Sequence, residues 1–508
     1  MTMHLNQRRI VSCATGKQAL QLPVRSVRLD LITQPDFPTV MHHGFGFKVS
    51  VSPNRLIPRV HSLTISNSMA LAPSEASGAG KWSSYMLSIY MGRQAPQPLG
   101  TVVFEEIEAK AKETLKDYPA CNIGAFMYAG GSAGTNSTYR ANRKALDKYA
   151  IIPRMLVNAT VRSLETTIFG VKYPSPIFIA PIGVQGIFHG DAELAPARAG
   201  QKLGVPFIMS TASSRSIEEV GKANGDGHRW YQLYWPRTND VTLSILKRAK
   251  DSGFSTLVVT LDTMVLGWRP HDLERAYIPF GHGVGIQVGR SDPVFMARYN
   301  RQPVYEHPDF PYDAVAQDKL YKAGDEKTKE AVFFGMEWLK ECNSGLYRDW
   351  EDLKFLRENW EGPLVIKGIQ SVLDAEKALE YGVDGIIVSN HGGRQVDGAI
   401  PSIYALERIM KSAKVKEAQS SGKLTVLFDS GIRTGSDIIK ALALGAQAVL
   451  LGRTWLYGLI AGGQAGLEQV LQHTLADLDT TLGLIGCKNL SEVQGKGDAI
   501  VTKLDIDP

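Results

Sequence analysis

Eight short apolar runs, each followed by a helix-like segment, recur from about residue 176 onward. They are rich in Val, Ile, Leu and Phe and occupy residues 176–182, 206–211, 230–235, 256–261, 363–369, 385–389, 424–428 and 448–451. Runs that are apolar on both faces and separated by helices are typical of buried parallel strands. Eight such units predict an α/β fold, a closed (β/α)8 TIM barrel whose active site is built at the carboxyl ends of the strands.

The part of the chain before these runs divides in two. Residues 1–80 are rich in Ser, Pro and His without a sustained helical or strand period, so we expect a disordered or targeting extension there. Farther on, Phe104, Ile107, Ala111 and Leu115 share one helix face, which predicts an N-terminal helical segment. The barrel domain is therefore expected to occupy residues 81–500.

The connection between the fourth and fifth runs, about residues 263–362, is far too long for an ordinary barrel loop. It contains Pro279-Phe280-Gly281-His282-Gly283 and many charged residues around 318–330. We expect one helix and a lid over the active site. The alternative for its central part is a disordered surface insertion.

The composition is that of a globular protein. Of the 508 residues 44% are hydrophobic, enough for a sizeable core, and no run of about 18 apolar residues predicts a membrane span. The net charge of +5 comes from residues 1–80, which hold eight Lys or Arg against three acids, so the remainder is neutral. A neutral body lacks a polyanion-binding surface, and no nucleic acid is expected as a partner.

The four cysteines, Cys13, Cys121, Cys342 and Cys487, are scattered, without a CxxC pair or the spacing of a metal site. We expect buried or incidental thiols in a reducing compartment and no bound metal. The expected location is intracellular, cytoplasmic rather than mitochondrial. The last residues, 505–508, do not match the peroxisomal signal.

Polar residues gather where the predicted strands end. The third run ends with Gln232 and Tyr234, the fourth with Thr260 and Asp262, and the fifth with Lys367, while residues 389–394, 429–433 and 452–453 follow the last three. One polar residue at a strand end is usually a helix cap or a solvated loop position. Their presence at so many ends favours one converging site.

The last two strand ends predict a phosphate site. Gly431 and Arg433 follow the seventh run, and Gly452 and Arg453 follow the eighth. Backbone amides at a helix N-terminus and a forked guanidinium suit a phosphate dianion, which barrel enzymes often bind at this place. The pair indicates a phosphate-bearing cofactor rather than ordinary loop glycines.

Lys367 follows an apolar run directly, so we expect its ammonium group inside the barrel. A buried ammonium needs an anion. A reduced flavin would provide one, and a structural salt bridge is the alternative.

The segment Ser389-Asn390-His391-Gly392-Gly393-Arg394 holds the candidate base. Its glycines let the backbone approach a ligand closely. The imidazole of His391 can take a proton near neutral pH, and Arg394 can hold a carboxylate through two hydrogen bonds. Asp262 can orient the imidazole and stabilise its charged form.

Together these segments resemble the FMN-dependent 2-hydroxy acid oxidase and dehydrogenase family, which includes glycolate oxidase, lactate oxidase and lactate 2-monooxygenase. The resemblance covers roughly residues 100–495. Its motifs are Ala180-Pro181-Ile182-Gly183, Tyr231-Gln232-Leu233-Tyr234, Leu261-Asp262-Thr263, Lys367-Gly368, the segment 389–394, and Asp429-Ser430-Gly431-Ile432-Arg433. Two stretches, Gly267-Trp268-Arg269-Pro270 and Ser291-Asp292-Pro293-Val294-Phe295, resemble the lactate 2-monooxygenase branch most closely.

The resemblance implies a role for each site residue. His391, Asp262 and Tyr234 would be catalytic, as the base, its partner and the donor to the substrate oxygen. The substrate would be bound by Tyr128, Tyr234, Arg269 and Arg394. The FMN would be bound by Ala180, Pro181, Ile182, Ser210, Gln232, Thr260, Lys367, Ser389, Asp429, Gly431, Arg433, Gly452 and Arg453. A homotetramer is expected by the same resemblance.

Two departures from the family pattern carry predictions. Ala212 stands where glycolate oxidases have a tryptophan, so we expect a substrate bulkier than glycolate. Residues 1–80 lack the His-Pro-Gly-Gly signature of haem-bearing relatives, which argues against electron delivery to cytochrome c.

The implied function is FMN-dependent oxidation of a lactate-like or bulkier 2-hydroxy acid to the 2-keto acid, with O2 as the electron acceptor. If the keto acid is retained, oxidative decarboxylation would follow, as in lactate 2-monooxygenase. The alternatives are an FMN-dependent 2-hydroxy acid dehydrogenase of a specialised metabolite and a non-catalytic flavin-binding protein. An IMP dehydrogenase-like NAD enzyme would need a loop cysteine, and none of the four lies at a strand end in such a setting.

Overall fold

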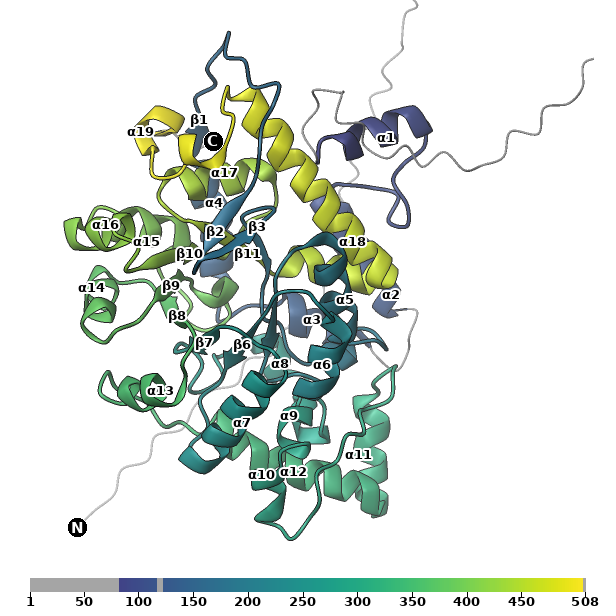
Figure 1. Ribbon diagram of the computed structural model, residues 1–508. Coiled ribbons are helices and arrows are strands. Elements are labelled where there is room, and N and C mark those ends of the chain that lie inside the picture. Colours follow the sequence, from purple (N-terminus) through teal and green to yellow (C-terminus); the bar gives the residue numbers. More distant parts are fainter. Residues whose placement is uncertain (1–81, 117–121, 506–508) are drawn as a thin grey trace, which may run out of the picture. The chain divides into compact units, whose positions relative to one another are not determined.

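The computed structural model describes residues 82–116 and 122–505. The predicted extension over residues 1–80 lies outside them. Eight parallel strands close into a barrel: β4 (Ile177–Ile179), β5 (Phe207–Ser210), β6 (Arg229–Leu233), β7 (Leu257–Thr260), β8 (Leu364–Ile369), β9 (Gly385–Val388), β10 (Thr425–Phe428) and β11 (Ala448–Leu451). Each predicted run forms one of these strands, and β11 pairs with β4, so the predicted TIM barrel is confirmed (Figure 1).

The barrel interior is a packed apolar cluster that includes Phe178, Trp230, Val365 and Leu427. The rings of Phe178 and Trp230 lie 4.6 Å apart. A hairpin of β2 (Thr166–Ile168) and β3 (Val171–Tyr173) packs against this cluster. Its Phe169 ring touches Gly385, the first residue of β9, so the hairpin covers the end of the barrel where the strands begin.

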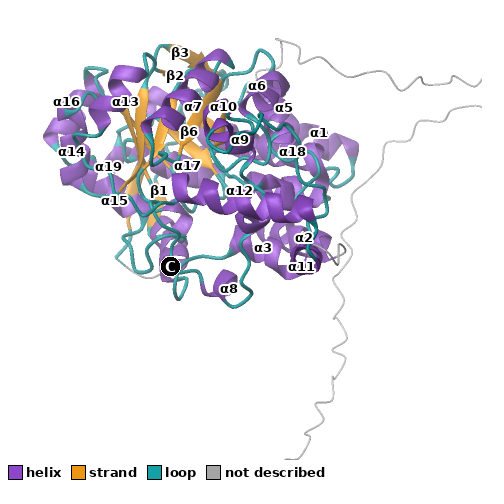
Figure 2. Cartoon of the chain, turned by 90° about the horizontal axis from the view of Figure 1, so that it is seen from below, coloured by secondary structure: helices purple, strands orange, loops and turns teal. Residues whose placement is uncertain are grey.

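Helices surround the barrel on the outside (Figure 2). They are α5 (Leu194–Leu203), α6 (Ile217–Asn224), α7 (Asn239–Asp251), α13 (Leu353–Asn359), α14 (Val372–Glu380), α15 (Ser402–Ile409), α16 (Ala413–Ser420), α17 (Gly435–Ala443) and α18 (Arg453–Leu484). Two begin with capping boxes, Ser216 with Glu219 in α6 and Thr434 with Asp437 in α17, which satisfy otherwise unpaired backbone N–H groups. Short 3₁₀ turns, η1 (Gln185–Ile187) and η3 (His391–Gly393), follow β4 and β9.

In the part of the chain that the structure describes, four helices precede the barrel: α1 (Ser84–Gly92), α2 (Phe104–Lys116), α3 (Asn122–Gly130) and α4 (Ser137–Asp147). The predicted helix is confirmed, because α2 buries Ile107, Ala111 and Leu115 and packs against α18. Near the carboxy-terminal end, η4 (Leu490–Glu492) and α19 (Gly497–Ile500) lead into β12 (Val501–Lys503), which pairs antiparallel with β1 (Tyr149–Ile151).

The long connection between β7 and β8 is more helical than expected. Before α13 it contains α8 (Pro270–Leu273), η2 (Pro279–His282), α9 (Gln287–Arg290), α10 (Pro293–Ala297), α11 (Ala314–Ala323) and α12 (Glu326–Cys342). The expectation of one helix is wrong because Asp313 and Asp325 cap two separate helices through their side chains. The central part is also packed into the main hydrophobic core, where the rings of Phe295 and Trp338 lie 5.0 Å apart.

None of the helices in the described residues combines the length and the hydrophobicity needed to cross a bilayer.

Candidate functional site

A cavity opens at the carboxyl ends of the barrel strands. Its walls bring together most of the residues predicted from the sequence: Tyr128, Ala180, Pro181, Ile182, Tyr234, Arg269, Lys367, His391, Arg394, Asp429, Gly431, Arg433, Gly452 and Arg453. They come from the ends of β4, β6, β9, β10 and β11, from Lys367 within β8, from α3 and from the start of the insertion. The carboxyl-end location is the one that a barrel active site is expected to have.

Five predicted residues lie outside this lining. Asp262 lies behind His391, and the other four, Ser210, Gln232, Thr260 and Ser389, are almost fully buried at the strand ends. The Gln232 Oε1 accepts a hydrogen bond from the Ser210 hydroxyl at 3.0 Å, whereas its Nε2 has no hydrogen-bond partner among the described residues. A buried N–H without a partner is rare and indicates a missing acceptor.

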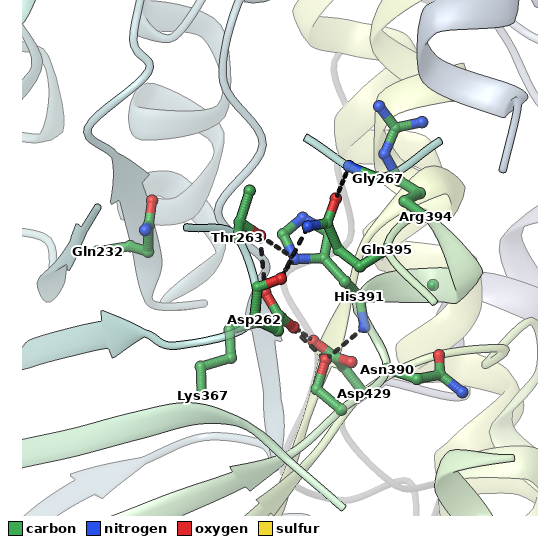
Figure 3. A network of polar contacts seen from close by, with 12 residues as sticks. Gln232, Asp262, Thr263, Gly267, Lys367, Asn390, His391, Arg394, Gln395 and Asp429 are labelled. Atoms are coloured by element: carbon green, nitrogen blue, oxygen red, sulfur yellow. Dashed lines mark hydrogen bonds and ion pairs between the residues drawn. The ribbon is translucent and has the colours of Figure 1, made fainter. Parts of the chain in front are cut away.

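The predicted base and its partner are in contact. The Nδ1 of His391 lies 2.8 Å from the Asp262 Oδ1, so the carboxylate fixes the ring and leaves Nε2 for proton transfer (Figure 3). Thr263 supports the pair, because its hydroxyl donates to the same Asp262 oxygen at 2.7 Å. The His391 backbone N–H donates to the Ser389 hydroxyl at 3.0 Å, which connects the loop to the end of β9.

The charges around this pair favour a neutral imidazole beside an ionised carboxylate. Burial lowers the pKa of His391, and Asp262 offsets only part of that effect. Burial would raise the pKa of Asp262, but the charges and hydrogen bonds of His391, Lys367 and Thr263 outweigh it and hold that pKa at about 2. His391 is therefore available to accept a proton near neutral pH.

Three arginines converge on one side of the cavity without a carboxylate partner. Arg394 donates to the carbonyl oxygen of Gly131 at 2.8 Å and Arg453 donates to it at 3.1 Å, both beside the C-terminal end of α3. The Nε of Arg269 donates to the backbone oxygen of Arg394 at 3.1 Å. None of the three has a carboxylate within 4.0 Å in the part of the chain that the structure describes.

These arginines form a positive field, which the charge of Asp272 offsets only in part at Arg394. Burial, with the neighbouring charges of Arg269 and Arg453, lowers the pKa of Arg394 to about 9. A buried cationic group without a counterion is costly unless an anion pairs with it. The geometry therefore suits a carboxylate bound to Arg269 and Arg394.

Two tyrosines adjoin this anion site. The Tyr128 ring lies 5.5 Å from the guanidinium of Arg394, and burial raises its pKa although both arginines lower it. Burial, followed by the charge of Asp262, also raises the pKa of Tyr234. Both hydroxyl groups are therefore protonated and can donate hydrogen bonds to a bound acid.

The other end of the cavity has the features predicted for phosphate. Gly452 is the N-cap of α18, and no atom would meet a Cβ built on it, so its backbone faces open space. The guanidinium of Arg433 lies 3.8 Å from the centre of the Phe104 ring, which holds it from α2. Helix N-terminal amides together with a fixed guanidinium bind phosphate well.

Lys367 lies within β8, three residues from its start, rather than beyond its end. Its Nζ is 3.0 Å from the Asp429 Oδ2 and 2.9 Å from the Ser389 hydroxyl. Burial would lower its pKa, but the charges of Asp429 and Asp262 outweigh it, so the ammonium stays charged. The salt bridge considered from the sequence is present, and Lys367 also lines the cavity, where a flavin would meet it.

The residues present fit an FMN group. The Gln232 Nε2, which has no partner among the described residues, could donate to a ring carbonyl, residues 180–182 offer an apolar wall, and the open backbone at Gly452 leaves room for a phosphate. The sequence prediction thus agrees with the shape and the donor set of the cavity.

Several residues near the site were missed from the sequence. Gln395, which follows Arg394 directly, and Thr263, which follows Asp262, contact the catalytic pair or its loop. Their position beside predicted residues was the only signal. Asp397 was missed too; its two carboxylate oxygens accept hydrogen bonds from Thr135 and Ser137 and so join the His391 loop to the start of α4.

Comparison with known proteins gives one consistent result. The chain matches the FMN-dependent dehydrogenase family over residues 120–499. It is 44% identical over 386 residues to the FMN-dependent alpha-hydroxy acid dehydrogenase qulF of Penicillium citrinum, covering 76% of this chain and 87% of that protein. It is 36% identical over 397 residues to an L-lactate oxidase of Lysinibacillus sphaericus, covering 78% and 92%. A crystal structure of mandelate oxidase superposes with a TM-score of 0.62 at 31% identity, covering 80% of this chain and 100% of that one.

Proposed function

Because the chain belongs to the FMN-dependent dehydrogenase family and is an FMN-dependent 2-hydroxy acid oxidoreductase, we propose that it oxidises a lactate-like or bulkier 2-hydroxy acid with O2 as the electron acceptor. The product is the 2-keto acid. The observation that carries this proposal is the contact of the His391–Asp262 pair beside two arginines that lack a carboxylate partner.

The proposed mechanism assigns one task to each group. Arg269 and Arg394 hold the substrate carboxylate, which places the α-carbon in a fixed orientation. The Nε2 of His391 takes a proton from the substrate, and Asp262 stabilises the imidazolium that results. Tyr128 and Tyr234 donate hydrogen bonds to the substrate oxygens. FMN, when bound, supplies the acceptor for the two electrons.

The wall of the cavity supports a substrate with an apolar side chain. Besides the polar groups, its lining includes Val184, Phe188, Ala212 and, from the insertion, Leu266 and Phe280. The small side chain of Ala212 leaves room that a tryptophan would fill. Steady-state rates across 2-hydroxy acids of increasing size test this; a strict preference for glycolate would contradict it.

The identity of the oxidant and the fate of the keto acid rest on different support. An L-lactate oxidase among the relatives supports O2 as the acceptor. If the insertion retains the 2-keto acid, hydrogen peroxide converts it to carbon dioxide, water and a carboxylic acid that is one carbon shorter. The expected homotetramer stays a prediction.

An anaerobic screen over 2-hydroxy acids, followed by product analysis in air, tests the proposal. The purified yellow protein should bleach with at least one apolar 2-hydroxy acid and regain its colour when O2 is admitted. Bleaching without recovery in O2 would indicate a dehydrogenase that uses another acceptor. A failure to bleach with any 2-hydroxy acid would favour the non-catalytic flavin-binding alternative.

A further inference from the structure

We propose that Gln395 is a positioning residue that aims Arg269 at the substrate carboxylate and holds the loop of Arg269 against the loop of His391. This inference rests on the proposed role of Arg269 in binding that carboxylate. Gln395 is not among the residues that line the cavity, and it acts through its neighbours.

The amide of Gln395 makes four hydrogen bonds. Its Oε1 accepts from the Arg269 Nη2 at 2.8 Å and from the Gly267 backbone N–H at 3.1 Å. Its Nε2 donates to the backbone oxygen of Asp262 at 2.7 Å and to that of Val265 at 3.0 Å. One side chain thus joins the carboxylate-binding arginine to the backbone of the residue that orients the base. Figure 3 shows its contacts with Gly267 and Asp262.

These partners allow the amide only one orientation. Arg269 and the Gly267 N–H can only donate, and the carbonyl groups of Asp262 and Val265 can only accept. A flipped amide would set donor against donor and acceptor against acceptor at all four contacts. The side chain therefore fixes the position of its partners rather than following them.

Arg269 depends on this contact for its direction. It is 5% exposed, and its Nε also donates to the same short segment, at the backbone oxygen of Arg394. The loop before it lies directly against that segment. A Cβ on Gly267 would come within 2.5 Å of the backbone oxygen of Arg394 and 2.7 Å of the backbone oxygen of Gln395. Without the Gln395 Oε1, the Nη2 of Arg269 would lose this hydrogen-bond acceptor.

A carboxylate that cannot be oxidised measures this role without turnover. Oxalate is titrated into the holoenzyme, and its binding is followed through the FMN absorbance spectrum. We expect Gln395→Met to weaken oxalate binding about tenfold and to raise KM similarly, because a hydrogen bond to a charged group is lost. The kcat should change much less than KM, and the FMN content should stay that of the wild type.

Gln395→Glu sharpens the test because it keeps an acceptor for Arg269 but adds a negative charge and loses both donated bonds. We expect it to weaken oxalate binding more than Gln395→Met does, since the new carboxylate competes for the guanidinium. Gln419→Met is the matched control. Gln419 is also half-buried, and it donates to the oxygens of Gly445 and Gln447 at 2.8 and 3.1 Å, away from the cavity.

Unchanged oxalate affinity in both Gln395 variants would overturn the inference, as would a loss of affinity of the same size in Gln419→Met. If Gln395→Met fails to retain FMN, Gln395→Glu, which keeps the size and polarity of the side chain, decides alone. Arg269→Lys separates this inference from the proposed function. If Arg269→Lys leaves oxalate binding unchanged, the proposed role of Arg269 in binding the carboxylate is wrong. If only the Gln395 variants leave oxalate binding unchanged, Arg269 binds the carboxylate without help from Gln395.

Discussion

The two ends of the cavity each present arginines to an anion, but they are built in different ways. At the phosphate end, Gly452 directly follows β11 and Arg433 lies in the loop after β10, and both line the cavity. At the carboxylate end, Arg269 and Arg394 come from loops 125 residues apart and are held by backbone carbonyl groups and by Gln395. The comparison predicts that substitutions at the phosphate end change FMN binding and that substitutions at the carboxylate end change substrate binding, so the two should respond separately.

The largest expected effect is at the carboxylate end. Arg394→Met should lower kcat/KM about a thousandfold, because removing one partner of a buried charge pair costs several kcal/mol. FMN binding should be retained, since Arg433 and the backbone of Gly452, the proposed phosphate-binding groups, are unchanged in this variant. Steady-state kinetics and the flavin content of the purified variant measure both quantities. Loss of FMN with normal kinetics after reconstitution would reverse the assignment of the two ends.

The next effect is at the phosphate end. Arg433→Met should weaken FMN binding about thirtyfold, the cost of a lost hydrogen bond to a charged group. With FMN in excess, KM should stay within about twofold of the wild-type value. Titration of the apoenzyme, followed by the quenching of FMN fluorescence, gives the affinity. A large rise in KM at saturating FMN would show that the two ends do not act separately.

A smaller effect concerns the pH dependence at the carboxylate end. His391 must be neutral to take a proton, so kcat/KM should fall as the pH drops through the His391 pKa, which burial places below its ordinary value. Asp262 raises that pKa, so Asp262→Asn should move the acid limb to lower pH by about one unit and reduce the maximum rate. A shift of the limb to higher pH would contradict the proposed pair.

The smallest effect tests the long-range contact between Arg433 and Phe104 at the phosphate end. Phe104→Leu keeps the apolar packing of α2 but removes the ring under Arg433, and FMN binding should weaken about fivefold, as expected for a cation–π contact. Phe104→Tyr should retain wild-type affinity because it keeps the ring. Equal affinities in all three proteins would mean that Arg433 is held by its own loop.

The same contrast explains how much could be predicted from the sequence. The barrel strands and the segment Gly452–Arg453 were recognisable because their signals in the sequence are local. These signals are apolar runs for the strands, and a glycine followed by an arginine for the segment. The contact of His391 with Asp262 was also predictable, since both follow strands that meet at one rim of the barrel.

The remaining features depend on contacts that no local pattern encodes. Gln395 is one polar residue in a loop, and its role appears only when the loop of Arg269, 126 residues away, lies against it. One helix was expected in the long connection, although Asp313 and Asp325 mark the starts of α11 and α12. The charged surfaces of these helices obscure their apolar positions in the sequence. Lys367 was placed at a strand end and lies inside β8, which continues to Ile369 through a register shift between Lys367 and Ile369.

The central claim is that His391 takes the proton from a substrate held at the carboxylate end. His391→Gln tests it most directly, by anaerobic mixing of the FMN-loaded variant with a substrate that bleaches the wild-type protein. We predict full FMN content and near wild-type oxalate binding, with reduction slowed by about 10³-fold or more, the contribution of a general base. Reduction at the wild-type rate in this variant would contradict the account.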